Sequence, residues 1–183
     1  MGKVFIAAGH HPKAPGAGFE GFYEHDEADR WLDVMFALDP DGRVLVRVPT
    51  GPLKDKAEFI NRRCTGGDIA VELHFNSAVN AAGEHVGSGC VTLYYPNSEP
   101  GLRLADACQE VLAAAFPPSR GLVAGWYRGD QSRGAYYFLE RVRCPSVILE
   151  PEFINHRDLI QSKRAEVAPA LAVALAAYVG EKL

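Results

Sequence analysis

Short apolar runs alternate with helical patterns along nearly the whole chain, and this alternation limits the folds that it can adopt. The runs are rich in strand-favouring residues and are bounded by glycine, proline or other turn-forming residues. Between them, apolar side chains recur at the spacing of amphipathic helices. Strands separated by helices predict an α/β fold, with a mostly parallel or mixed twisted sheet flanked by helices on both faces. The expected strands are 3–8, 43–48, 68–75, 89–95 and 146–150; the expected helices are 24–38, 54–63, 99–116, 135–142 and 157–183, the last interrupted near Pro169; and 119–133 is expected to be irregular.

The length and cysteine pattern favour one ordinary globular unit. A chain of 183 residues can bury a sizeable core without cross-links. No repeat, linker or low-complexity tract divides it, so we expect residues 1–183 to form a single domain. Its four cysteines are scattered and include no CxxC pair, which favours free thiols over a disulfide framework or a structural zinc site.

Charge and hydropathy argue against two classes of partner. The formal net charge of −4 gives no general attraction to nucleic acid or anionic lipid. No apolar stretch reaches membrane-spanning length without proline or charge. The N-terminal apolar run is short and lacks a small-residue cleavage site, which is typical of a strand rather than a signal peptide. We therefore expect a protein that is made in the cytoplasm and inserts into no membrane.

Polar residues that could support chemistry gather where expected strands end. His10 follows the first strand, His74 lies at the end of the third, and Glu150 ends the last. Ligands of open α/β sheets bind beyond the carboxyl ends of the strands, so these side chains should lie at one edge. Glu24, at the start of the first helix, is a fourth candidate.

Two imidazoles, a carboxylate ligand and a further free carboxylate are the groups of a catalytic zinc site. Zinc lowers the pKa of a bound water towards ~7 and polarises a carbonyl, while the free carboxylate transfers the proton. Each residue also has an ordinary structural explanation: Glu24 suits a helix N-terminus, and Glu72 with His74 could be a buried hydrogen-bonded pair. Glu150 is harder to explain this way, since a carboxylate ending an apolar strand is destabilising unless it is paired or functional.

Three ordered motifs give the sequence a family resemblance. It resembles the zinc-dependent N-acetylmuramoyl-L-alanine amidases, in particular the compact catalytic domains of phage and prophage lysins. The matching segments, in chain order, are Gly9-His10, Pro15-Gly16-Ala17, Glu24, His74-Phe75-Asn76-Ser77 and 145–150, with Phe153 and Asn155 beyond. The resemblance covers nearly the whole chain, although Ala7-Ala8 stands where the family commonly has Asp-Pro.

The resemblance implies zinc bound by His10, Glu24 and His74, with Glu150 as the catalytic acid and base. The implied reaction is hydrolysis of the amide between N-acetylmuramic acid and L-alanine in peptidoglycan. Two alternatives stay open: His11 could replace His10 as a ligand, and Glu27, one helical turn after Glu24, could replace Glu24.

Four residues are candidates for substrate contact: Asn76, Glu152, Trp126 and Arg128. Trp126 and Arg128 lie in a loop rich in glycine, arginine and aromatic residues, which suits sugar stacking and peptide-carboxylate contacts, although Trp126 could equally cover the edge of the core. Glu152 should point to the same side as Glu150, and so position substrate or raise the pKa of Glu150.

Two other functions remain as alternatives. A zinc peptidase that cuts within the peptidoglycan stem peptide would use the same types of ligand, and an inactive wall-binding module would need none of them. The apparent lack of an export signal favours a phage or prophage lysin that acts on the cell wall after release. The oligomeric state is not predicted.

Overall fold

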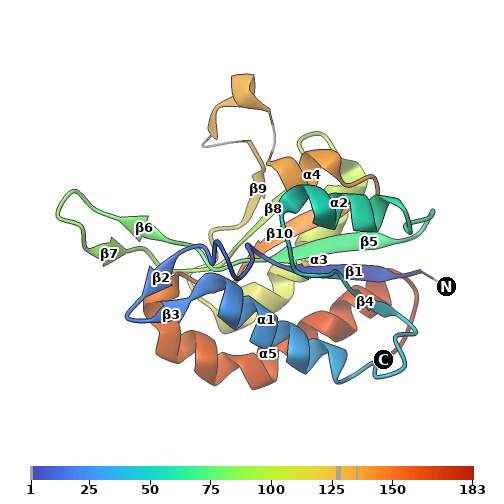
Figure 1. Ribbon diagram of the computed structural model, residues 1–183, viewed down its shortest axis with the longest axis horizontal. Helices are drawn as coiled ribbons and strands as arrows, with labels where there is room; N and C mark the ends of the chain where they lie inside the picture. The colour runs from blue at the N-terminus through green and yellow to red at the C-terminus, as the bar shows by residue number, and fades with distance from the viewer. Residues whose placement is uncertain (1, 127–128, 135) are drawn as a thin grey trace.

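A six-stranded mixed sheet lies at the centre of the molecule (Figure 1). The computed structural model describes residues 2–126, 129–134 and 136–183. The strand order is β4-β1-β5-β10-β8-β9, and every neighbouring pair is parallel except β10 with β8. The strands are β1 (Val4–Ala8), β4 (Leu45–Arg47), β5 (Ile69–Leu73), β8 (Val91–Tyr94), β9 (Leu122–Ala124) and β10 (Ser146–Glu150).

Helices cover both faces of this sheet, which confirms the expected α/β fold. One face carries α1 (Glu24–Phe36), α3 (Glu99–Ala115) and α5 (Arg157–Tyr178), and the other carries α2 (Leu53–Asn61) and α4 (Tyr137–Arg141). Side chains of β1 alternate between the two cores because successive residues of a strand point to opposite faces. Val4, Ile6 and Ala8 join the larger core, while Phe5 and Ala7 join the smaller one.

Helix α5 corrects one expectation. The interruption predicted near Pro169 is wrong, because the helix continues from Arg157 to Tyr178 with Pro169 inside it. Proline removes one backbone hydrogen bond and disfavours a helix interior by ~3 kcal/mol. The neighbouring Val167, Leu171 and Leu175 are buried in the larger core, and each such burial stabilises by ~1.5–3 kcal/mol. Tertiary packing therefore outweighs the local preference.

The region 119–133 corrects a second expectation. It was expected to be irregular throughout, but Leu122–Ala124 form β9, which pairs in parallel with β8. A short 3-10 helix, η2 (Gln131–Arg133), follows. Three residues between Gly121 and Gly125 are too few to produce a recognisable alternation, so only pairing with β8 defines this strand.

The described residues also form two small hairpins and one further 3-10 helix. The hairpins are β2 (Gly18–Phe19) with β3 (Phe22–Tyr23), and β6 (Ala78–Val79) with β7 (His85–Val86). The 3-10 helix η3 (Ile154–His156) precedes α5. The hairpin β6–β7 projects away from the body of the molecule (Figure 1).

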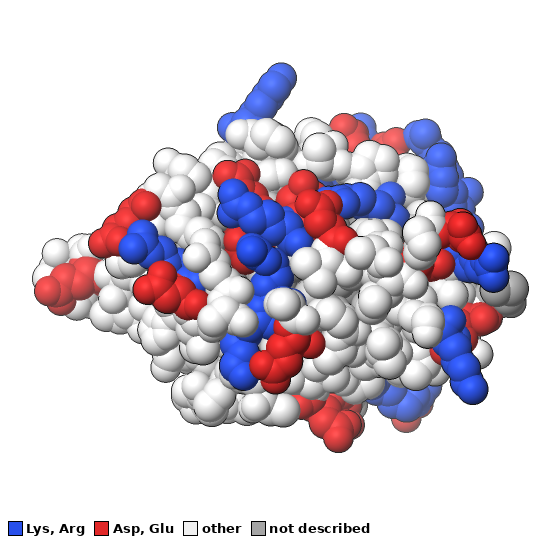
Figure 2. Space-filling model, turned by 90° about the horizontal axis from the view of Figure 1, so that it is seen from below, with Lys and Arg blue, Asp and Glu red and all other residues white. Residues whose placement is uncertain are grey.

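The surface formed by α1 and α5 mixes both signs of charge. Seen from below, basic and acidic side chains are interspersed over it (Figure 2). Several are ion-paired, among them Arg157 with Glu20 and Lys163 with Glu166. Exposed pairs of this kind contribute little to stability, so the buried cores must supply most of it.

Two further expectations can be compared with the structure. All four cysteines are free, as expected. Among the described residues, no helix has the length and apolar character needed to cross a bilayer.

Candidate metal centre

Parallel strand pairing brings the candidate residues to one edge of the sheet. Ala8 of β1 and Leu149 of β10 both pair with Leu73 of β5, so these three strands end side by side. His10 follows β1, His74 follows β5 and Glu150 ends β10. The edge is the carboxyl end of the strands, where open α/β sheets bind ligands.

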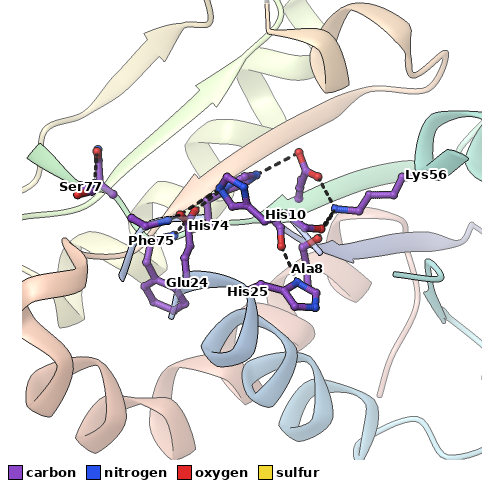
Figure 3. Close-up of polar contacts among 12 residues, drawn as sticks. Ala8, His10, Glu24, His25, Lys56, His74, Phe75 and Ser77 are labelled. Atoms are coloured by element: carbon purple, nitrogen blue, oxygen red, sulfur yellow. Dashed lines mark hydrogen bonds and ion pairs between the residues drawn. The ribbon is translucent and has the colours of Figure 1, made fainter. Parts of the chain in front are cut away.

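His10, Glu24 and His74 meet there. Their potential ligand atoms all lie within 4.8 Å of one another. The Glu24 carboxylate lies between the two rings: its Oε2 is 3.0 Å from His10 Nε2, and its Oε1 is 2.7 Å from His74 Nδ1 (Figure 3). Glu24 is the first residue of α1, so the start of this helix places the carboxylate beside the residues that follow β1 and β5.

Two glycines make room for this arrangement. A Cβ on Gly16 would lie 2.4 Å from His10 Cδ2 and 2.5 Å from Glu24 Oε2, and Gly16 has a φ of +81°. A Cβ on Gly9 would lie 2.6 Å from the His74 ring. Neither position has space for a side chain, and Gly16 also needs a backbone conformation that other residues rarely adopt. The backbone N–H of the adjacent Ala17 donates to Glu24 Oε2.

The electrostatics of the site keep Glu24 ionised. Burial alone would raise its pKa, but hydrogen bonds with His10 and His74 lower this pKa to about 2. Burial alone would likewise lower the pKa of His74. The charge of Glu72 and hydrogen bonds with Glu24 and Glu72 outweigh this and raise the His74 pKa well above 6.5. The two imidazoles and the carboxylate are thus strongly coupled.

The donor set fits a catalytic zinc ion. Two imidazole nitrogens and one carboxylate oxygen match the three protein ligands of such sites, which leave a further position for water or substrate. His74 presents Nδ1 to this set, while its Nε2 bonds to Glu72 Oε2 at 3.2 Å. A ligating histidine commonly donates its second ring N–H to a carboxylate in this way.

The alternative ligands lie in different positions. The backbone of His11 forms a bridge with Ala14, and the described cluster includes His10 instead. Glu27 is fully buried and accepts hydrogen bonds from Trp31 Nε1 and from Arg164 Nη1 of α5, so it lies on the side of α1 that packs against α5. Glu24, three residues earlier on the helix, faces the two histidines.

Glu150 lies in the same cavity as the cluster. This cavity has a volume of ≈ 310 Å³ and is lined by His10, Glu24, His74 and Glu150, together with aromatic side chains. Glu150 Oε2 is buried and has no hydrogen-bond partner among the described residues. Burial raises the pKa of Glu150 to about 8. A carboxyl with an elevated pKa and a free oxygen is suited to accepting and donating a proton near neutral pH.

The expected substrate contacts occupy different positions. Asn76 lines the same cavity as the cluster, and its Oδ1 accepts from the Ser77 N–H at 2.8 Å. Trp126 is partly exposed and lines a second cavity of ≈ 280 Å³, which also contains Arg120 and Glu150. Arg128 lies outside the described residues.

Glu152 does not occupy the expected position. It is 1% exposed, and its Oε1 accepts from the backbone N–H groups of Gly89 and Phe153, both at 2.7 Å. Its carboxylate therefore joins two loops instead of facing either cavity, because the chain turns after Glu150 and does not continue as a strand. The expectation that Glu152 positions substrate or raises the pKa of Glu150 finds no support in this geometry.

Two residues near the site, Lys56 and Arg120, were not predicted from the sequence. Lys56 is 1% exposed and binds the backbone of His10 and the side chain of Glu72. Its position between Leu53 and Ile60, on the apolar side of an expected helix, was a signal that a charged residue is buried there. Arg120 carries no comparable signal, because its place in the second cavity depends on the unpredicted strand β9.

Comparison with known proteins gives a consistent result. Residues 4–177 match the family described as N-acetylmuramoyl-L-alanine amidase. No curated protein sequence matches the chain. Several solved structures have the same fold, and three of them are described next. The catalytic domain of the amidase CwlV from Bacillus (Paenibacillus) polymyxa is 20% identical with a TM-score of 0.79, and the comparison covers 100% of both chains. An amidase from Clostridium difficile 630 is 19% identical with a TM-score of 0.77, covering 100% of this chain and 98% of that one. An amidase from Nostoc punctiforme is 22% identical with a TM-score of 0.74, covering 98% of both.

Proposed function

The chain belongs to the N-acetylmuramoyl-L-alanine amidase family, and we propose that it hydrolyses the amide between N-acetylmuramic acid and L-alanine at a zinc ion held by His10, Glu24 and His74. The observation that carries this proposal is the convergence of two imidazoles and a carboxylate beside the unpartnered oxygen of Glu150. The family supports hydrolysis of a peptidoglycan amide, and the zinc ion is inferred from the donor set.

Zinc and Glu150 would have different roles in the reaction. When bound, zinc would supply polarisation of the scissile carbonyl and a lowered pKa for a water molecule. Glu150 would accept the proton of the attacking water at Oε2 and return it to the nitrogen of the leaving amine. Its pKa of about 8 comes from burial, and a cation nearby would lower it towards the operating pH.

The two cavities provide room for both parts of the substrate. Their linings share Asn76, Leu93, Tyr136 and Glu150, so the two cavities adjoin at the proposed catalytic carboxylate. We place the scissile amide over Glu150, with the glycan and the peptide extending into opposite cavities. Asn76, Trp126 and Arg128 stay predicted substrate contacts, and the second cavity adds Arg120, whose guanidinium can pair with a carboxylate.

Mass spectrometry of a digest of purified peptidoglycan tests this function. An amidase releases intact stem peptides with a free L-alanine amino group and leaves a free lactyl carboxyl on the glycan. A zinc peptidase would instead shorten the peptides and leave L-alanine attached to muramic acid. Shortened peptides alone would contradict the proposed bond, and the absence of any product with zinc-loaded protein would support the inactive wall-binding alternative.

A role as a phage or prophage lysin, made in the cytoplasm and acting on the wall after release, is a further proposal from the sequence. If it is correct, the purified protein should clear a suspension of susceptible cell walls when it is added from outside. Cleavage of soluble fragments without any loss of turbidity would argue against this role.

A further inference from the structure

A buried lysine contacts the two segments that carry the histidines of the site. Lys56 extends from α2 and is 1% exposed. Its Nζ donates to three oxygens: Ala8 O at 2.6 Å, His10 O at 2.8 Å and Glu72 Oε1 at 3.0 Å (Figure 3). An ammonium has three protons, so its hydrogen-bonding capacity is filled by groups at the ends of β1 and β5.

The partner of this lysine reaches His74 directly. Glu72 is also 1% exposed, and its second oxygen, Oε2, lies 3.2 Å from His74 Nε2. An ionised carboxylate can only accept, so it requires His74 to carry a proton on Nε2. Nδ1 faces Glu24, the proposed co-ligand, and gives up its own proton when a metal binds there. Glu72 then keeps the remaining proton on Nε2, so it holds His74 in the tautomer that binds the metal through Nδ1.

The other contacts of Lys56 hold the turn that carries His10. His10 has a φ of 57°, a conformation that residues other than glycine rarely adopt and that persists only when the surroundings hold it. Lys56 binds the carbonyls of Ala8 and His10, and His25 Nδ1 donates to the intervening Gly9 carbonyl at 2.8 Å. Three successive carbonyls are thus fixed where the chain turns His10 towards Glu24.

We propose that Lys56 and Glu72 are positioning residues of the metal site, which together orient two of its three ligands. Lys56 fixes the His10 turn and the Glu72 carboxylate, and Glu72 fixes the tautomer and ring direction of His74. Stability alone explains the pair poorly, since a buried ion pair can often be replaced by apolar residues without loss of stability. The inference rests on the proposed metal site and is independent of which amide is cut.

Two double variants separate positioning from folding. Lys56→Met with Glu72→Gln removes both charges but keeps a side-chain carbonyl that can accept from His74 Nε2. Lys56→Met with Glu72→Met removes both charges and this acceptor. Neither leaves a buried charge unpaired, which is the main reason that a single substitution here could prevent folding. Asp39→Asn, a buried substitution outside the site, is the control for a general loss of stability.

The measurement is the zinc dissociation constant of each folded protein, obtained by competition with a chromophoric chelator. Loss of a residue that supports a metal ligand typically weakens metal binding ~10–100-fold. We expect Lys56→Met with Glu72→Gln to bind zinc ~10-fold more weakly than wild type, and Lys56→Met with Glu72→Met to bind at least ~10-fold more weakly again. Asp39→Asn should match wild type.

Each outcome is decisive. Equal affinity of the two double variants would overturn the role of Glu72, and wild-type affinity of the glutamine-containing variant would overturn that of Lys56. If wild type itself binds no zinc, the proposed metal site fails. If wild type binds zinc and both double variants match it, only the positioning inference fails.

Discussion

At the scale of single residues, the site holds three carboxyls, of which two have lowered pKa values and one has a raised pKa. Hydrogen bonds with His10 and His74 lower the pKa of Glu24 to about 2 despite its burial. Burial acts against ionisation of Glu72 as well, but the charges of His74 and Lys56 lower its pKa. For Glu150, burial outweighs the nearby charges of His74 and Arg120 and raises the pKa to about 8. Carboxyls whose pKa values differ suit different roles, and under the proposed function the ionised Glu24 and Glu72 would be ligand and positioning residue, while Glu150 would carry the proton.

Replacing Glu150 tests the proton carrier. Glu150→Gln keeps the shape of the side chain but cannot accept a proton, so we expect kcat to fall ~10²–10⁴-fold. The zinc content of the purified variant should stay at the wild-type level, because Glu150 is outside the ligand set. Turbidity of a cell-wall suspension measures the rate, and elemental analysis measures the metal. A variant that clears walls at the wild-type rate would remove Glu150 from the mechanism.

The raised pKa values of Glu150 and His74 predict how the metal-free protein responds to pH. A group whose pKa is higher in the folded state stabilises fully below its unfolded pKa and loses this contribution as the pH rises through the folded value. For Glu150 the loss extends from 4.5 to about 8, and for His74 it begins at 6.5 and continues above it. The free energy of unfolding should therefore fall between pH 5 and pH 9. In Glu150→Gln, the free energy of unfolding should fall less steeply between pH 5 and pH 8 than in wild type. A pH dependence identical to wild type would contradict the raised pKa of Glu150.

At the scale of elements, Asp39 fixes the entry to β4. Its carboxylate accepts from the backbone N–H groups of Arg43 at 2.9 Å and of Val44 and Leu45 at 2.7 Å. Burial acts to raise its pKa, but these hydrogen bonds lower it below the ordinary 3.8. Its contribution to stability is therefore present above pH 3.8 and is lost as the pH falls through the lowered value.

Asp39→Asn should lower the free energy of unfolding by ~1–3 kcal/mol at pH 7. The variant lacks the negative charge that the three N–H groups stabilise. Since wild-type Asp39 loses this charge as the pH falls, the difference in free energy of unfolding between variant and wild type should be smaller near pH 3. Urea unfolding at both pH values measures this. A difference that stays constant with pH would show that the ionised form of Asp39 is not the stabilising one.

Helix α5 offers a second test at this scale. Pro169→Ala restores a backbone donor inside the helix and removes the steric conflict of the proline ring. The helix preference of ~3 kcal/mol is partly offset by the greater freedom of the unfolded chain, so we expect a stabilisation of ~2 kcal/mol. Thermal unfolding measures it, with activity as a control that should not change. If Pro169→Ala is less stable than wild type, the packing around α5 favours the proline ring over alanine.

The strength of each local signal explains which elements could be predicted. Strands β1, β5 and β10 are mostly apolar, because both faces of the sheet are covered, and such runs are visible in the sequence. Strand β9 has only three residues and depends on pairing with β8. The continuity of α5 depends on burial against α1 and α3, which outweighs the signal of Pro169.

At the scale of the whole molecule, the fold itself assembles the site. Parallel pairing places His10, His74 and Glu150 at one edge of the sheet, and this could be predicted from where the expected strands end. The sequence favours Glu24 over Glu27 only through the family resemblance, because the direction in which each side chain points depends on which side of α1 packs against α5. The contacts of Lys56 and Glu152 could not be predicted, because both side chains bind groups from distant segments of the chain.

Zinc titration of chelator-treated enzyme, with the products identified by mass spectrometry, most directly tests the assignment as a zinc amidase. Product formation should be absent in the metal-free protein, rise linearly with added zinc and stop rising at one equivalent. The product should be intact stem peptide with a free L-alanine amino group. Undiminished release of that product by the metal-free protein, or zinc-dependent cleavage at a different bond, would contradict the assignment.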